Sequence, residues 1–187
     1  MIRPIVTRDT PVLRTVAAEI PVREISAAAI QSIITDMKDT LTACADGLAL
    51  AAPQIGESAR IFVVSGRFFP PKSDGDRQES QTPGPDMVYI NPVITKTSAR
   101  QKPLEEGCLS VRWLYGDIKR YEKVTISAYD ENGQKFTRGA AGLLAQVFQH
   151  ETDHLNGTLF IDAATNIREI LPEDTHSHDH DHAGLSH

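Results

Sequence analysis

The sequence predicts an α+β fold in which antiparallel β-sheets surround a central α-helix carrying an H-E-x-x-H motif. Three observations predict this class. Apolar residues recur at helical spacing over 25–47 and again over 140–155. Between these helices lie β-branched and aromatic runs at 60–65, 87–95 and 123–130, which are typical of strands. The order lacks regular β-α-β alternation, which favours antiparallel sheets over a doubly wound fold.

The first predicted helix, over residues 25–47, has apolar side chains at steps of three and four residues. Its expected buried stripe consists of Ile30, Ile33, Met37, Leu41 and Cys44. Ser26 is the expected N-cap and Gly47 the expected stop signal. Cys44 is interpreted as the last core position, because free cysteine often behaves as a small buried hydrophobe. The preceding segment 11–20 begins with a proline and predicts a shorter helix.

Turn and loop signals separate the predicted strands. Asn132-Gly133 lies between two extended runs, and both residues tolerate positive φ, which predicts a β-hairpin. The polar segment 70–86, rich in Pro and Gly, predicts a long mobile surface loop. The tail at 171–187 is rich in His and Asp, and we expect it to be disordered. We therefore expect a single domain over residues 1–170.

Size and composition exclude several classes of protein. The chain has 187 residues, 40% of them hydrophobic and 24% charged, as in ordinary globular domains. No apolar stretch approaches the ~20 residues that span a bilayer. The formal net charge is −6, much of it in the tail, and no basic patch indicates a nucleic-acid partner. Two cysteines are too few for a disulfide framework. The first residues lack the layout of a secretory signal, so we expect a cytoplasmic location.

The second predicted helix, over 140–155, carries the two histidines of the sequence that lie outside the tail. His150 and His154 are four residues apart, so both imidazoles lie on one face and can bind one metal ion. Glu151 is rotated by about 100° from His150, close enough to reach a metal-bound water without being a ligand. The alternative is a pair of surface histidines that share this spacing by chance.

The third metal ligand is not where one large class of zinc proteases has it. In that class the position of Phe160 would be a histidine, and phenylalanine cannot bind a metal. A soft ligand is available in Cys108, which follows Gly107 and precedes what we interpret as the start of an extended segment. One thiolate, two imidazoles and an open position form a catalytic metal arrangement. The alternative is that Cys108 is a buried small hydrophobe.

Three segments then resemble the signature motifs of the peptide deformylase family, in the same order. They are GLALAAPQIG (47–56), EGCLS (106–110) and QHETDHLNG (149–157). Agreement with the family extends over most of residues 1–165. The resemblance implies antiparallel sheets around a central helix that carries the H-E-x-x-H motif. It also implies an enzyme that removes the formyl group from the N-formylmethionine of newly synthesised polypeptides.

The resemblance further implies one divalent metal ion bound by Cys108, His150 and His154. This ion would be Fe(II) in cells, with zinc, nickel or cobalt as substitutes. A metal-bound hydroxide would attack the formyl carbon, with Glu151 acting as general base and then as general acid. The partners implied are formylmethionyl peptides of nascent chains, near the ribosome exit in the bacterial cytoplasm. We expect a monomer.

The remaining site residues follow from the same resemblance. The Gln54 side-chain amide and the Leu109 backbone N–H would stabilise the oxyanion. Independently of the resemblance, metal-bound imidazoles usually donate their other N–H to an acceptor, and Glu106 and Asp153 are the acidic candidates. The alternative for Asp153 is a solvated side chain. Arg120 is expected to support Glu106, as a matching arginine does in the family. The expected substrate-binding residues are Leu48, Ala49, Leu104, Glu106, Gly107, Leu143 and Val147.

Departures from the family pattern at two places leave alternatives open. Ala49 stands where the family usually has glycine, and Arg112-Trp113 follow where it usually has proline and often glycine. These changes concern substrate preference beyond the first residue more than the chemistry. An inactive metal-binding relative is one alternative. A zinc endopeptidase with Glu173 as its third ligand is another, although Glu173 lies at the edge of the tail.

Overall fold

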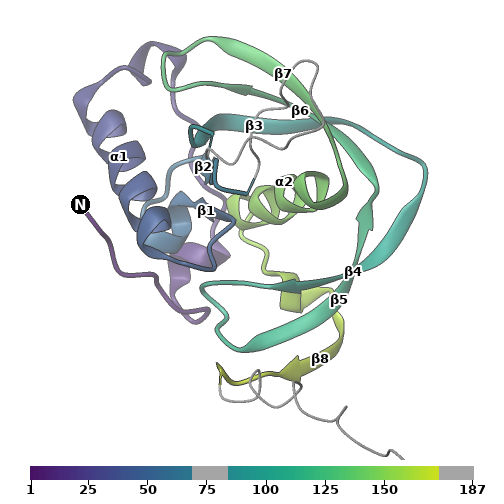
Figure 1. Cartoon of the computed structure of the whole chain (residues 1–187). Coiled ribbons are helices and arrows are strands. Elements are labelled where there is room, and N and C mark those ends of the chain that lie inside the picture. The colour runs from purple at the N-terminus through teal and green to yellow at the C-terminus, as the bar shows by residue number, and fades with distance from the viewer. Residues whose placement is uncertain (69–83, 173–187) are drawn as a thin grey trace, which may run out of the picture.

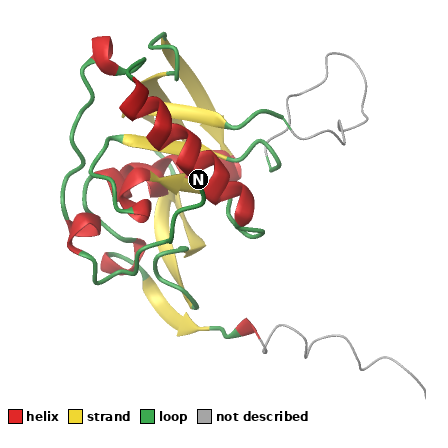
Figure 2. Ribbon diagram, turned by 90° about the vertical axis from the view of Figure 1, so that its left-hand side faces the viewer, coloured by secondary structure: helices red, strands yellow, loops and turns green. Residues whose placement is uncertain are grey.

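The computed structural model describes residues 1–68 and 84–172 (Figures 1 and 2). Most of the predicted loop at 70–86 and of the predicted tail at 171–187, including Glu173, lies outside the described residues. The helices and strands are α1 (Ala28–Ala43), β1 (Ala49–Ala51), β2 (Ile61–Val64), β3 (Met87–Thr97), β4 (Gln101–Gly107), β5 (Leu114–Tyr121), β6 (Lys123–Tyr129), β7 (Lys135–Ala141), α2 (Gly142–Leu155) and β8 (Thr165–Glu169). Short 3-10 turns lie at Pro11–Arg14, Val22–Glu24, Ala52–Ile55 and Phe160–Asp162.

The strands form two antiparallel sheets. The first has the order β1-β2-β3-β6-β7 and the second β4-β5-β8. In Figure 1, α2 lies between them, and it contacts β1, β3, β6 and β7 of the first sheet and β5 of the second. The fold is thus mixed α+β with antiparallel sheets, as predicted. The hairpin between β6 and β7 is also confirmed, with Gly133 at φ 76°.

Strand β2 shows why the first sheet is covered on both faces. Successive side chains of a strand point to opposite faces. Ile61 and Val63 belong to an apolar cluster with α1, whereas Phe62 and Val64 belong to a second cluster with α2. All four are fully buried. The continuous apolar run IFVV is therefore that of a strand with helices on both sides, and Figure 2 shows α1 crossing the outer face.

Helix α1 differs from its prediction at its start and on its buried face. The helix begins at Ala28, and its N-cap is Ala27 without a side-chain hydrogen bond, so the prediction of Ser26 as N-cap is wrong. Asp36 and Thr40 are buried because the N-terminal segment binds them. The Arg3 backbone N–H donates to Thr40 Oγ1 at 2.8 Å, and Arg3 Nη1 donates to Asp36 Oδ2 at 3.2 Å.

The apolar stripe of α1 is also rotated from the prediction. Met37 and Leu41 are fully buried as predicted, and so is Ile34, whereas Ile30 and Ile33 are half-buried. Cys44 is the C-cap and is half-buried, so its interpretation as a core position is wrong. The buried face therefore follows Ile34, Met37 and Leu41, together with Asp36 and Thr40, which contact the N-terminal segment.

The second sheet contains the strands that periodicity did not reveal. β4 and β8 are largely exposed and polar, so neither shows an apolar run. The prediction of an extended segment after Cys108 is wrong. The Val111 backbone N–H donates to the Cys108 carbonyl at 3.0 Å, so Leu109 and Ser110 form a turn, and β5 begins only at Leu114. This turn brings the chain back along β4.

Polar side chains hold helix α2 at its middle and in its last turn. Gln149 accepts from the Tyr121 backbone N–H at 2.9 Å and donates to the Tyr121 carbonyl at 3.0 Å, which joins α2 to the end of β5. Arg60 donates to the Leu155 carbonyl at 3.2 Å, in the last turn of the helix. Phe148 packs edge-on against Tyr89 in the first core. Within residues 1–68 and 84–172, no helix is long and apolar enough to cross a membrane.

Candidate metal centre

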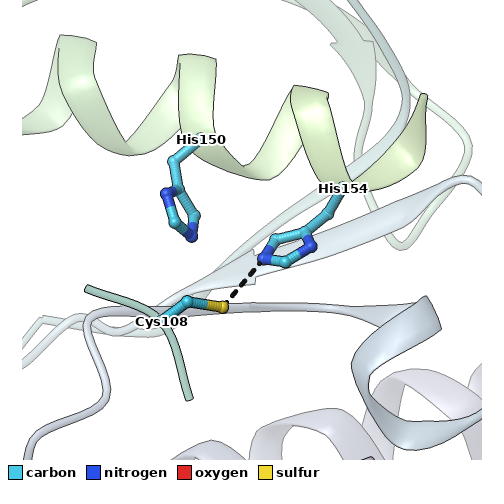
Figure 3. A group of neighbouring side chains, drawn as sticks. All are labelled: Cys108, His150 and His154. Atoms are coloured by element: carbon cyan, nitrogen blue, oxygen red, sulfur yellow. Dashed lines mark hydrogen bonds between the residues drawn. The ribbon is translucent and has the colours of Figure 1, made fainter. Parts of the chain in front are cut away.

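Helix α2 and the turn after β4 bring three potential ligands together (Figure 3). His150 and His154 project from the same face of α2, and Cys108 faces them from the first residue after β4. Their ligand atoms lie within 4.8 Å of one another. The Cys108 Sγ and His154 Nε2 atoms are 3.2 Å apart. Residues 46 positions apart thus converge on a space that a single ion would fill.

His150 is oriented by a buried ion-pair network. Its Nδ1 atom lies 2.9 Å from Glu106 Oε2, which leaves Nε2 for the space shared with Cys108. Arg120 donates to both carboxylate oxygens of Glu106, at 2.7 and 2.8 Å, and to Asp153 Oδ2 at 2.6 Å. Burial raises the pKa of Glu106, but hydrogen bonds from Arg120 and His150 outweigh it and lower this pKa to about 2. Glu106 is therefore a permanent carboxylate.

The roles expected of Glu106, Asp153 and Arg120 are observed only in part. Glu106 contacts a ligand imidazole and is supported by Arg120, as expected. Asp153 instead contacts Arg120. The physical reason is helical geometry, since Asp153 is rotated by about 100° from the adjacent His154 and so faces β5. Asp153 therefore acts on His150 only through Arg120 and Glu106.

The electrostatics of the centre favour a thiolate at Cys108. Burial raises the pKa of this thiol, but the neighbouring charge of His154 and hydrogen bonding with both histidines lower it well below its ordinary value. Burial lowers the pKa of His150, whereas Cys108 and Glu106 raise it well above normal. A divalent cation binds a thiolate and neutral imidazoles, so its binding here would displace the proton that the raised pKa of His150 favours.

Two buried polar atoms test whether a metal fits this place. Within the described parts of the chain, Glu151 Oε2 and His154 Nδ1 are the buried side-chain polar atoms without a hydrogen-bond partner. Burial raises the pKa of Glu151 to about 7. One sulfur and two imidazole nitrogens can hold a metal ion and leave a position open for water. The buried Glu151 carboxylate beside them can act as the base for that water. The residues therefore fit a divalent metal.

Gln54 is fixed with its amide donor towards the cysteine. It lies in the turn Ala52–Ile55 directly after β1, and its Oε1 atom accepts from the Ala51 backbone N–H at 2.8 Å. This contact directs Nε2 towards Cys108 Sγ, at 3.5 Å, and Ser110 Oγ, at 3.4 Å. Gln54 is 2% exposed, so its orientation is held by the fold and not by solvent. An N–H donor is thereby available beside the centre.

A cleft opens beside the three candidate ligands, between β1, β4 and α2. Most of the predicted substrate-binding residues line it, and so do both predicted oxyanion donors: Leu48, Ala49, Glu106, Gly107, Leu143, Val147, Gln54 and Leu109. Within the described residues, Leu104 does not line this cleft, and its substrate-binding role stays a prediction. The sequence reasoning missed Gln146, which a helical step of four from His150 could have indicated.

Gly107 and Phe160 are each explained by a close neighbour. A Cβ atom at Gly107 would lie 2.7 Å from the Tyr115 ring, so a side chain there would force the ring out of place. Phe160 is 2% exposed, and its ring stacks on His150 with a centroid distance of 6.3 Å. The residue at the position of a third protease histidine thus belongs to the apolar support of the centre.

Comparison with known proteins gives one consistent family. The family model described as polypeptide deformylase matches residues 2–169. The curated peptide deformylase of Psychrobacter cryohalolentis is 37% identical over 171 residues, which are 91% of this chain and 84% of that protein. The peptide deformylase of Thermomicrobium roseum is 43% identical over 161 residues, 86% of this chain and 85% of that protein.

Solved structures agree with the sequence relatives. A peptide deformylase from Legionella pneumophila has a TM-score of 0.72 and 38% identity, and the match covers 89% of this chain and 88% of that one. A class I type b peptide deformylase from Acinetobacter baumannii bound to Met-Ala-Ser has a TM-score of 0.74 and 30% identity, covering 87% of this chain and 99% of that one. Sequence and fold therefore lead to the same family.

Proposed function

Because the chain belongs to the polypeptide deformylase family, we propose that Cys108, His150 and His154 hold the divalent metal of a peptide deformylase. Members of this family are metal-dependent hydrolases that act on formylated peptides. The observation that carries the proposal is the convergence of one sulfur and two imidazole nitrogens within 4.8 Å. Helix α2, held between the two sheets, is the element that presents the H-E-x-x-H motif.

The donor set suits several first-row metals, and we propose Fe(II) in cells with zinc, nickel or cobalt as substitutes. When bound, the ion acts as a Lewis acid and makes water a nucleophile at neutral pH. The chain supplies a thiolate at Cys108 and fixes His150 through Glu106. A hydrogen bond of this kind orients a ligand imidazole and raises its basicity.

Glu151 is proposed as the proton carrier of the reaction. Its buried Oε2 atom would take the proton of the attacking water and later deliver it to the amine nitrogen of the leaving methionine. Burial raises the pKa of Glu151 to about 7, which makes both directions of transfer accessible at neutral pH. Gln54 Nε2 and the Leu109 backbone N–H are the proposed donors to the oxygen of the tetrahedral intermediate.

The cleft offers a place for the rest of the substrate. We propose that the methionine side chain lies among Leu48, Leu143 and Val147, which line the cleft beside His150. β1 and β4 are edge strands of their sheets, and an extended peptide can pair with an unpaired strand edge. The related Acinetobacter structure is bound to Met-Ala-Ser, which supports a short methionine-led peptide as the ligand.

The proposed reaction also suggests the source of the substrate and the cellular location of the protein. We propose that residues 1–170 act as one catalytic domain on nascent formylmethionyl chains in a bacterial cytoplasm, near the ribosome exit. A monomer suffices, because all the proposed site residues come from one chain. No nucleic-acid contact is part of this proposal.

The test is formate release from formyl-Met-Ala-Ser by protein loaded anaerobically with Fe(II) or with added nickel, beside a casein digest. The proposal expects formate and no casein cleavage. Full metal loading without formate release would instead favour an inactive relative. Casein cleavage, together with metal loss in Glu173→Ala and not in Cys108→Ala, would indicate an endopeptidase.

A further inference from the structure

An ion pair crosses the mouth of the cleft. Arg112 Nη1 donates to Asp46 Oδ2 at 2.8 Å, although the two residues are 66 positions apart. Asp46 lies between α1 and β1 on one wall of the cleft, and Arg112 lies in the turn between β4 and β5 on the other. Both residues line the same cleft as His150 and Glu151. The contact therefore joins the two walls.

The Arg112 side of this contact is held in place by its neighbours. The guanidinium lies 5.4 Å from the centre of the Trp113 ring, within the range of a cation–π interaction. Trp113 has φ 67°, in the left-handed region that bulky residues rarely adopt. Its carbonyl accepts from the Ile170 backbone N–H at 2.8 Å, just after β8. The turn that carries Arg112 is thus anchored to the second sheet.

Two other acidic side chains that line the cleft, Glu105 and Glu106, already have cationic partners. Glu106 pairs with Arg120 inside the protein, and Glu105 pairs with Arg168. The Asp46 and Arg112 side chains are 62% and 40% exposed, so their pair is open to water and can separate at small energetic cost. A peptide that lies beneath the pair removes water from it and so strengthens it.

We propose that Asp46 and Arg112 form a clasp that closes over the substrate chain beyond its first residue. The inference rests on the proposed function, which places the formyl end at Cys108 and the peptide between the edges of β1 and β4. A chain extended from there towards solvent passes the wall-to-wall contact. The clasp acts by retaining substrate, so its removal changes KM and leaves the chemical step to the metal centre.

The test compares two substrates in the metal-loaded enzyme. On the proposed placement, formyl-Met-Ala-Ser would reach the mouth of the cleft, whereas formylmethionine amide would end before it. Arg112→Ala is expected to raise KM for the tripeptide about 2- to 5-fold, the range of an exposed ion pair. The rise in KM for the amide is expected to be smaller, and kcat for the tripeptide should change less than KM.

Charge variants separate the clasp from a general effect on the fold. Arg112→Asp should raise the tripeptide KM further than Arg112→Ala, and adding Asp46→Arg to it should restore KM towards the wild-type value. Arg112→Lys keeps the charge and should remain near wild type. Arg14→Ala is the matched control, because it removes a similarly exposed arginine that pairs with Asp162 at 2.6 Å elsewhere.

Three results would overturn the clasp. They are an equal rise in KM for both substrates, a loss confined to kcat, and a double charge reversal that is no better than Arg112→Asp. Thermal unfolding of each variant shows whether the fold is intact. Failure of the proposed function is visible earlier and separately, because the wild-type enzyme would then release formate from neither substrate.

Discussion

The floor of the cleft, around Cys108 and His150, and its mouth, between Asp46 and Arg112, satisfy their charged groups in different ways. On the floor, Glu106 is 3% exposed in its side chain, and its carboxylate has two hydrogen bonds from Arg120 and a contact with His150. At the mouth, one contact joins two side chains that are 62% and 40% exposed.

The contrast between floor and mouth indicates where amino-acid substitutions should be tolerated. Breaking a buried ion pair by removing one partner typically costs about 3–5 kcal/mol, because the remaining charge is left uncompensated. An exposed pair contributes about 0–1 kcal/mol. The floor therefore leaves little freedom of residue type, whereas the exposed mouth should tolerate substitution of Arg112 and Asp46. Substitutions on the floor should consequently have larger effects than substitutions at the mouth.

The largest expected effect is that of Cys108→Ala. Loss of the thiolate leaves two imidazoles, which do not complete a three-ligand site. The variant should retain no stoichiometric metal after gel filtration and release no measurable formate. Metal content by mass spectrometry checks this outcome. Cys44→Ala, at the half-buried end of α1, is the matched control and should keep its metal.

Glu151→Gln should come next, with a loss of about 10²–10⁴-fold in kcat for formyl-Met-Ala-Ser, the usual range for a general acid–base group. Glutamine keeps the shape of the side chain but cannot carry the proton. Metal content should equal that of the wild type. A variant that loses its metal, or one that keeps full activity, would remove Glu151 from the proposed role.

Gln54→Ala should lower kcat by about 10²–10³-fold, as for loss of one oxyanion donor. The metal should stay bound, because Gln54 is not among the three proposed ligands. Gln146→Ala is a useful comparison, since Gln146 lines the same cleft but donates to the Glu105 carbonyl at 2.8 Å. Equal losses in the two variants would argue against a specific donor role for Gln54.

Glu106→Gln should have the smallest effect of the floor variants, a weakening of metal affinity by about 10- to 100-fold. The substitution keeps the size of the side chain but weakens its hold on His150 and Arg120. Competition with a chelator measures the affinity. Glu105→Gln, the adjacent and half-exposed glutamate on β4, serves as the control. Similar metal affinities for Glu106→Gln and Glu105→Gln would contradict the expectation that the buried Glu106 matters more for metal binding than its exposed neighbour.

The candidate centre was more accessible to sequence reasoning than the second sheet. The spacing of His150 and His154 depends only on helical geometry, and motif resemblance supplied Cys108 as their partner. β8 gave no signal, because Thr165–Glu169 is exposed along its whole length and has no alternating apolar pattern. Its pairing with β5 is a tertiary fact that local sequence does not encode.

Polar contacts between residues far apart in the chain could likewise not be predicted from the sequence. Asp36 and Thr40 interrupt the apolar face of α1, and their contacts with Met1 and Arg3 explain their burial. The proposed clasp joins Asp46, near the end of the first predicted helix, to Arg112, a departure from the family pattern. Periodicity reports which side of an element is apolar, but it does not report which distant side chain will face it.

The central claim is that one sulfur and two imidazoles bind a single divalent ion. X-ray absorption spectroscopy of the zinc-loaded protein tests it most directly. We expect one sulfur at about 2.3 Å and two nitrogens at about 2.0–2.1 Å from zinc, with the sulfur lost in Cys108→Ala. A shell of nitrogen and oxygen alone in the wild-type protein would contradict it.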